Sequence, residues 1–167
     1  LIDFKGRKMF VNIIEVLKDN AIKYSDKIAI EDENNSLSWK ELDESSDRIA
    51  RFFLKMGYEK GCHIGLSGKN SVEWAKIFLG ILKFGGIPIL LNIQLKICEL
   101  KKMVEHCDIE CIVYEEQINT VKKLDNGKIK SICFDEIKYT SINKADFKME
   151  KLNIVPSDTA CIIFTSG

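Results

Sequence analysis

The sequence predicts an α/β fold in which helices cover both faces of a mostly parallel sheet. Apolar runs of strand length alternate along the 167-residue chain with stretches whose apolar residues recur at helical spacing. One run, residues 87–91, is apolar throughout, which is typical of a strand buried on both faces. Hydrophobic residues make up 46% of the chain, enough for a core, and the length fits one domain.

The first forty residues predict a helix and then two short strands. Residues 10–24 carry an apolar stripe at helical spacing. The members of this stripe are Phe10, Ile13, Ile14, Leu17, Ala21 and Ile22. Strands at 28–30 and 37–39 flank the turn formed by residues 33–35.

The sequence predicts a second helix and has a characteristic residue pattern at each of its ends. Ser38 and Glu41 have the spacing of a capping box, in which the hydroxyl accepts from an early helical N–H and the carboxylate reaches back. Gly57 is expected to end the helix in the left-handed conformation. The expected core face is Leu42, Ile49, Phe52, Phe53 and Met56.

The rest of the chain predicts five strands separated mainly by helices. The expected strands are 62–66, 87–91, 110–114, 131–134 and 159–164. The expected helices are 70–82, 97–104 and, shorter, 117–124. Asn70 with Glu73 gives the cap signature of the first of these helices, and Gly85-Gly86 closes it. Residues 125–127 are expected to turn, and 135–156 to form a loop with one helical turn.

Charge and hydropathy exclude several classes of function. Lys plus Arg equals Asp plus Glu, so the net charge is zero. The chain therefore lacks the excess of basic residues that attracts nucleic acid or an anionic membrane. No apolar run approaches the length of a membrane span. The first eight residues lack the apolar core of a signal peptide.

The chain has six cysteines and no C-x-x-C pair. They are Cys62, Cys98, Cys107, Cys111, Cys133 and Cys161. The pattern favours reduced, mostly buried thiols in a cytoplasmic protein. A metal site formed by His106, Cys107 and Cys111 is the alternative interpretation, although its spacing is poor and the sequence suggests no fourth ligand.

Ligands of parallel sheets bind beyond the carboxyl ends of the strands, so the residues after the strands are the candidate site. This rule selects residues 67–70 and 92–94, together with Thr165, Ser166 and Gly167. Residues 65–70 are only faintly similar to a P-loop, because His63 and Asn70 stand where that motif needs Gly and Ser or Thr. The triplet Thr165-Ser166-Gly167 offers two hydroxyls and close backbone approach to phosphate oxygens.

Four segments, in order and at matching spacing, resemble the adenylate-forming superfamily. The first three read Leu-Ser-Trp-Lys-Glu-Leu at 37–42, Lys-Asn-Ser-Val-Glu-Trp at 69–74 and Leu-Lys-Phe-Gly-Gly-Ile-Pro at 82–88. The fourth, at 158–167, is similar to the lead-in to the signature loop of that family. The resemblance runs from about Phe10 to the last residue. It departs at 90–94, where both prolines and the arginine of the family are replaced, the arginine by Gln94.

The resemblance implies that residues 1–167 are a truncated N-terminal (AMP-binding) domain that ends at the start of the phosphate-binding loop. The implied reaction joins a small carboxylic acid to AMP, with ATP and Mg²⁺, and passes the acyl group to a thiol. Coenzyme A and carrier-protein phosphopantetheine both stay open as acceptors, because the arginine is absent at Gln94. Thr165, Ser166 and Gly167 would begin the loop that holds the β- and γ-phosphates.

The other catalytic groups of that family lie later in the sequence, so the resemblance predicts an inactive fragment that self-associates through uncovered apolar surface. Two further hypotheses stay open. One is an amino-acid-activating adenylation domain that serves a carrier protein, with an acyl carrier protein as the expected partner. The other is a non-catalytic α/β binding module.

Overall fold

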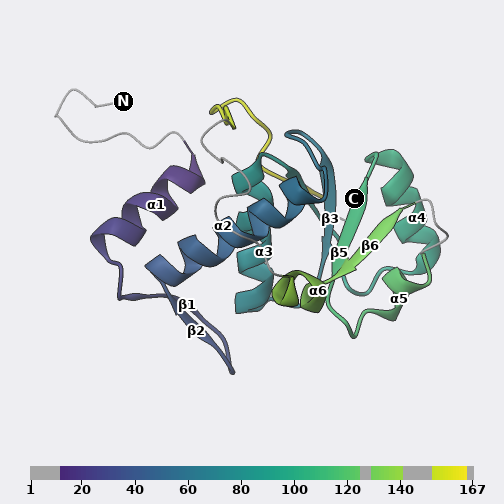
Figure 1. Ribbon diagram of the computed structural model, residues 1–167. Helices are drawn as coiled ribbons and strands as arrows, with labels where there is room; N and C mark the ends of the chain where they lie inside the picture. The colour runs from purple at the N-terminus through teal and green to yellow at the C-terminus, as the bar shows by residue number, and fades with distance from the viewer. Residues whose placement is uncertain (1–11, 125–128, 141–151, 165–167) are drawn as a thin grey trace.

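The fold is built around a parallel sheet with the strand order β6-β5-β3-β4-β7. The computed structural model describes residues 12–124, 129–140 and 152–164 (Figure 1). The strands are β3 (His63–Ser67), β4 (Ile87–Leu90), β5 (Cys111–Tyr114), β6 (Lys130–Cys133) and β7 (Ile162–Ile163). All four pairings between neighbours are parallel. An antiparallel hairpin of β1 (Ile28–Glu31) and β2 (Ser36–Ser38) stands apart from this sheet.

Helices cover both faces of the sheet, as predicted. They are α1 (Ile13–Lys23), α2 (Trp39–Lys55), α3 (Val72–Phe84), α4 (Ile97–His106), α5 (Asn119–Lys122) and α6 (Phe134–Tyr139). One hydrophobic cluster joins α2, α3 and α6 to the sheet through Ile64, Leu66 and Val113. The other joins α4 and α5 to the opposite face through Ile89, Ile112 and Tyr114. Figure 1 shows α2 and α3 on one side of the strands and α4 with α5 on the other.

The predicted signals at both ends of α2 are confirmed. The Ser38 N–H donates to Glu41 Oε2 at 2.8 Å, and the Glu41 N–H donates to Ser38 Oγ at 3.3 Å. After the helix, Gly57 has φ +89°, the left-handed conformation that glycine adopts without strain. Met56 departs from its prediction. Its side chain is 41% exposed because it lies at the end of the helix and not on the core face.

Two helix starts differ from the sequence prediction. The first helix begins at Ile13, since the side chain of Asn12 accepts from the Glu15 N–H at 3.0 Å and caps it. The predicted start at Phe10 lies outside the described residues. The cap of α3 is Ser71 and not Asn70: its hydroxyl accepts from the Trp74 N–H at 3.1 Å.

The end of the chain shows two further differences. Residues 134–139 form α6, which agrees with the helical turn predicted within 135–156. The helix begins at Phe134, where a strand was predicted to end, because the Glu136 carboxylate accepts from the Cys133 N–H at 2.8 Å and caps it. The last strand was predicted to span residues 159–164. Only Ile162–Ile163 pairs, and Ile163 and Phe164 are 62% and 42% exposed because β7 lies at the edge of the described sheet. The predicted turn at 125–127 lies outside the described residues.

The cysteines are all free thiols, and four of the six are buried. Cys98 is exposed and Cys161 is half-buried. Cys111 lies inside β5 with no exposed surface, whereas His106 is exposed at the end of α4. Within the described ranges, no group of three or more His, Cys, Asp or Glu side chains could hold a metal ion. In the same ranges, no helix is long and apolar enough to cross a membrane.

Helices α2 and α3 approach each other closely at a glycine. A Cβ on Gly80 would lie 2.4 Å from Ile49 Cγ2, closer than real Cβ atoms come. Near this contact the ammonium of Lys83, with a side chain 1% exposed, reaches from α3 to Asp43 Oδ1 at 2.5 Å and Asp47 Oδ1 at 2.7 Å on α2. The helices therefore share both an apolar contact and a buried charge cluster.

We expect Gly80→Ala to destabilise the protein by about 1–3 kcal/mol, since the added methyl group overpacks the contact with Ile49. Helix propensity alone predicts the opposite sign, a gain of about 1 kcal/mol. Urea unfolding measures the difference. Ala75→Gly, on the same helix, is the control and should lose about 1 kcal/mol. A more stable Gly80→Ala protein would contradict the close approach.

Candidate functional site

The carboxyl ends of β3, β4 and β5 lie side by side. Their register pairs Leu66 with Leu90 on one side and with Val113 on the other. The two described strand exits that the sequence selected, residues 67–70 and 92–94, therefore meet at one edge of the sheet, as predicted. Because Leu90 also pairs with Ile163, β7 runs to the same edge and ends at Ile163. The three predicted phosphate-binding residues, Thr165, Ser166 and Gly167, lie outside the described residues.

The exit of β3 is held tightly. The Glu115 N–H donates to the Ser67 carbonyl at 3.0 Å, and the Lys69 N–H donates to Glu115 Oε2 at 3.0 Å. A Cβ on Gly68 would lie 2.7 Å from the Phe134 ring, so only glycine fits beneath that ring without displacing it. The loop from β3 to α3 is thus fixed at the edge, and the Lys69 side chain is exposed above it.

The exit of β4 is open by comparison. Asn92 Oδ1 accepts from the Gln94 N–H at 2.9 Å, and the Asn92 carbonyl accepts from the Leu95 N–H at 3.2 Å. This turn is local, and Asn92, Ile93 and Gln94 are all exposed. Side chains at this exit are therefore free to contact a ligand or another part of a longer protein.

The exit of β5 carries two carboxylates that the sequence analysis did not select. Glu115 reaches across to β3, and Glu116 pairs with Lys122 and accepts from Cys133 Sγ at 3.1 Å. The hydrogen bond from Lys122, followed by that from Cys133, lowers the pKa of the Glu116 carboxyl. Their position directly after an apolar strand was the available signal, and the same rule that selected 67–70 could have found them.

Cys133 lies at this edge without the properties of a nucleophile. Burial raises the pKa of its thiol first, and the hydrogen bond to the Glu116 carboxylate raises it further, against backbone contacts that lower it. A thiol with a raised pKa forms little thiolate at neutral pH. Its hydrogen bond therefore orients Glu116.

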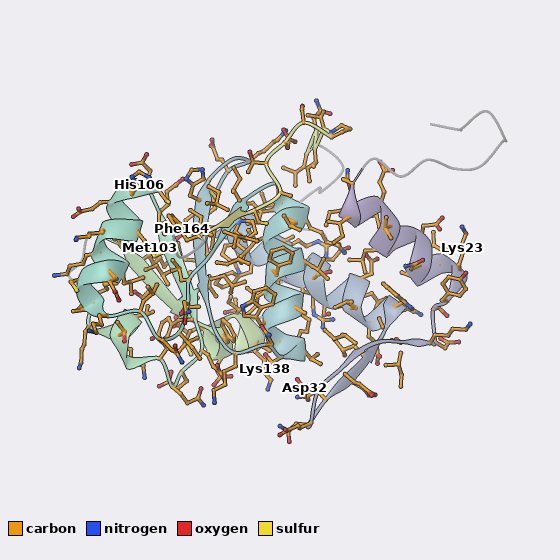
Figure 2. All side chains as sticks on the ribbon, turned by 180° about the vertical axis from the view of Figure 1, so that it is seen from behind. Lys23, Asp32, Met103, His106, Lys138 and Phe164 are labelled. Atoms are coloured by element: carbon orange, nitrogen blue, oxygen red, sulfur yellow. The ribbon has the colours of Figure 1, made fainter. Side chains whose placement is uncertain are left out.

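Both histidines lie at the opposite end of the sheet. His63 begins β3, and its Nδ1 lies 2.5 Å from the Cys107 carbonyl. His106 ends α4, which runs back from the carboxyl edge; Figure 2 shows it far from Asp32 and Lys138. The described part of the carboxyl edge thus offers carboxylates, a lysine, amides and backbone groups. Such groups suit positioning and charge neutralisation better than proton transfer by imidazole.

The hairpin is anchored to this edge by one carboxylate. Asp32 Oδ1 accepts from the backbone N–H groups of Asn34 and Asn35, each at 2.9 Å, within the hairpin turn. Its Oδ2 accepts from the Val72 N–H at 2.8 Å, 40 residues away in sequence at the first turn of α3. A carboxylate at the start of a helix is favoured by the positive end of the helix dipole. The bonds from Val72 and then Asn34 lower the pKa of Asp32.

An apolar cavity beside α3 lies away from this edge. A cavity of about 390 Å³ lies between α1, the end of α3 and the segment that precedes β7. It is lined by Ile13, Ile14, Phe78, Leu82 and residues of the stretch 154–161. These residues belong to the amino-terminal side of the sheet, so the cavity and the strand exits are separate features.

Comparison with known proteins identifies related sequences and folds. The family model described as "AMP-binding enzyme" matches residues 17–167. The chain is 27% identical over 157 residues to zwittermicin A synthase ZmaJ of Bacillus cereus, covering 93% of this chain and 29% of that protein. It is 29% identical over 107 residues to a medium/long-chain-fatty-acid–CoA/3-oxocholest-4-en-26-oate–CoA ligase of Mycobacterium marinum, covering 64% of this chain and 20% of that one.

Solved structures share the fold. A fatty acyl CoA synthetase of Mycobacterium tuberculosis superposes with a TM-score of 0.80 at 18% identity, covering 93% of this chain and 33% of that one. The chain therefore spans about a third or less of the proteins it matches here. The five-stranded parallel sheet described above is the shared architecture.

We expect Asp32→Asn to weaken the dependence of stability on pH in acid. Because the folded-state pKa of Asp32 lies below its ordinary value of 3.8, the carboxylate contributes its full stabilisation above that value and loses it as the pH falls through the lower folded pKa. Chemical denaturation at a series of pH values from about 6 to about 3 measures the slope. Equal slopes for the wild-type and Asp32→Asn proteins would show that the anchor does not act through its charge.

Proposed function

We propose that residues 1–167 are the N-terminal part of an ATP-dependent carboxylate ligase, because this chain belongs to the AMP-binding enzyme family. The family match over residues 17–167 is the observation that carries the proposal, and it includes the stretch that leads into Thr165-Ser166-Gly167. Members of this superfamily form adenylates. The identity of the carboxylic acid that this protein activates, and of the thiol that accepts the acyl group, belongs to the proposal.

The proposed reaction has two steps. A carboxylate oxygen of the acid attacks the α-phosphorus of ATP; the bond from that phosphorus to the bridging oxygen breaks, and pyrophosphate leaves. A thiol sulfur then attacks the acyl carbon, the thiol proton is lost to solvent, and AMP leaves with the electron pair of the broken C–O bond. Both steps depend on positioning and on neutralisation of phosphate charge.

In this proposal Thr165, Ser166 and Gly167 supply hydroxyl and backbone donors to the β- and γ-phosphates. The described edge supports that role, because β7 brings Phe164 to the same edge as the exits of β3 and β4. Magnesium would neutralise the phosphate charge when the nucleotide binds. By the resemblance to the adenylate-forming superfamily, the carboxylate that would hold it lies later in the sequence than Gly167.

The thiol acceptor is coenzyme A or the phosphopantetheine of an acyl carrier protein. Gln94, in the exposed turn formed by residues 92–94, stands where the family often has arginine. Both acceptors therefore stay in the proposal. An adenylation domain that activates an amino acid is the alternative. The matched proteins include both a synthase and a CoA ligase, and neither is more than 29% identical.

We expect the natural gene product to exchange pyrophosphate into ATP in the presence of one class of acid from a panel of fatty, aryl and amino acids. Ser166→Ala should slow this exchange about tenfold, the effect of losing one hydrogen bond to a charged group. Ser157→Ala, an exposed hydroxyl in the preceding turn, is the control and should have no effect. The chain 1–167 alone should give no exchange.

Failure of the folded natural gene product to exchange with any acid would contradict the ligase and favour a binding module. Exchange by purified 1–167 would contradict the proposal that catalytic groups lie outside this chain. The acid class that works separates an acyl ligase from an amino-acid-activating domain.

We further expect the chain 1–167 to self-associate through the edge at β7. Ile163 and Phe164 are exposed there, and uncovered strand edges pair with other copies. Light scattering over a wide concentration range should show a rising mean mass, and Ile163→Lys should suppress the rise. Ile22→Lys, at a side chain 83% exposed on α1, is the control and should leave it unchanged. A constant monomer mass would exclude this edge as a contact.

A further inference from the structure

A turn before β7 is closed by one carboxylate. Asp158 Oδ2 accepts from the Val155 N–H at 2.7 Å, and the Asp158 N–H donates to the Val155 carbonyl at 3.0 Å. The same carboxylate oxygen lies 2.7 Å from Lys60 Nζ. Lys60 Nζ also donates to the Asn153 carbonyl at 2.5 Å, across 93 residues of sequence. Lys60 therefore contacts the segment before β7 at two points.

Lys60 is itself held at the end of α3. The neighbouring Gly61 N–H donates to the Gly85 carbonyl at 2.8 Å. The stem of Lys60 lies over Gly85, since a Cβ there would be 2.8 Å from Lys60 Cγ. Gly85 has φ +85°, so it ends α3 in the left-handed conformation and leaves room for the stem. The lysine thus links two fixed parts of the fold, the start of β3 and the end of α3, to the segment before β7.

Apolar packing holds that segment at its two ends, where Leu152 and Ile162 lie against the hydrophobic clusters, and a cavity lies between them. The cavity of about 390 Å³ lies behind it, lined by residues 154–156 and 158–161 on one side and by α1 and α3 on the other. The sheet holds the segment through two register pairs only, Ile89 with Ile162 and Leu90 with Ile163. Among the residues that the structure describes, the contacts of Lys60 are the side-chain polar contacts that join this turn to the body of the protein.

We propose that Lys60 and Asp158 are positioning residues, which hold the segment before β7 and thereby place Thr165, Ser166 and Gly167 for the phosphates of ATP. This inference rests on the proposed function. Neither side chain is proposed to touch the nucleotide, since Lys60 and Asp158 lie at the amino-terminal end of β7 and the phosphates would lie at its carboxyl end. The ion pair lowers the pKa of the Asp158 carboxyl, chiefly through the hydrogen bond from Lys60, and keeps it charged at neutral pH.

The first test is independent of activity. Hydrogen–deuterium exchange of the natural gene product should be faster at residues 154–164 in Lys60→Met than in the wild type, with α4 and β5 unchanged. Lys60→Arg, which keeps the charge, should exchange nearly as the wild type does. The control is Lys23→Met, which removes a lysine that pairs with Asp19 on α1 at 2.7 Å. Equal exchange in Lys60→Met and wild type would overturn the positioning role.

The second test separates positioning from stability. In the pyrophosphate exchange assay, Lys60→Met should raise the KM for MgATP about three- to fivefold, the range for loss of a partly exposed ion pair, and leave the KM for the acid unchanged. A purely structural role would instead lower the amount of active protein and leave both KM values unchanged. Unchanged KM for MgATP, with slower turnover only, would therefore overturn the inference.

The variant Asp158→Asn guards against a variant that fails to fold, because its amide oxygen can still accept from the Val155 N–H while the charge that pairs with Lys60 is removed. A KM for MgATP in the double variant Lys60→Met with Asp158→Asn no higher than that of Lys60→Met would support a direct ion pair, whereas two rises that simply add would count against it. A folded wild-type protein with no exchange activity would overturn the proposed function, and the hydrogen-exchange comparison would still decide whether Lys60 holds the segment.

Discussion

Burial of β3 on both faces is the constraint on which the rest of the fold depends. A central parallel strand must be covered on each side. Ile64 and Leu66 of β3 belong to one hydrophobic cluster, and Leu91 and Ile112 of the other cluster lie close to Gly65. Its neighbours β4 and β5 pair with it in parallel, so each connection must return to the opposite end of the sheet. The connection through α3 returns on one face and the connection through α4 on the other. The loops after β3 and β4 therefore diverge at the carboxyl edge, which is where open α/β sheets bind ligands.

Small residues let the strands and helices come close enough for this arrangement. A Cβ on Gly65 would lie 2.8 Å from Leu91 Cδ1, and one on Gly80 would meet Ile49. A Cβ on Gly68 would likewise lie too close to the ring of Phe134. Residues 65–70, which are faintly similar to a P-loop in sequence, thus have a packing role in the strand and its exit. The similarity reflects the need for small residues where a helix and a strand pack closely.

The sequence predicted the features whose causes are local, and it failed where the cause is a distant residue. The Ser38–Glu41 capping box and the left-handed Gly57 depend on neighbours within a few positions, and both are confirmed. The length of the last strand was predicted wrongly, because a continuous apolar run cannot say how far the strand pairs with its neighbour. The cap of α3 was predicted one residue too early, at a helix start to which Asp32 of the hairpin also binds. The ion pair of Lys60 with Asp158 joins residues that are far apart in the sequence. Such pairs carry no signal in local spacing. The phosphate-binding triplet remains a prediction, since it lies outside the described residues.

The close contact of α2 and α3 also bears on the order in which the chain can fold. The two helices and β3 between them are consecutive in sequence, so their contacts close short loops and form early at small entropic cost. The pairing of β7 with β4 must wait for a much later part of the chain. During synthesis the ribosome releases α2, β3 and α3 before β7, so Lys83 and both of its aspartates are available to pair before β7 exists. Of the described strands of this sheet, β7 is made last and adds to β4.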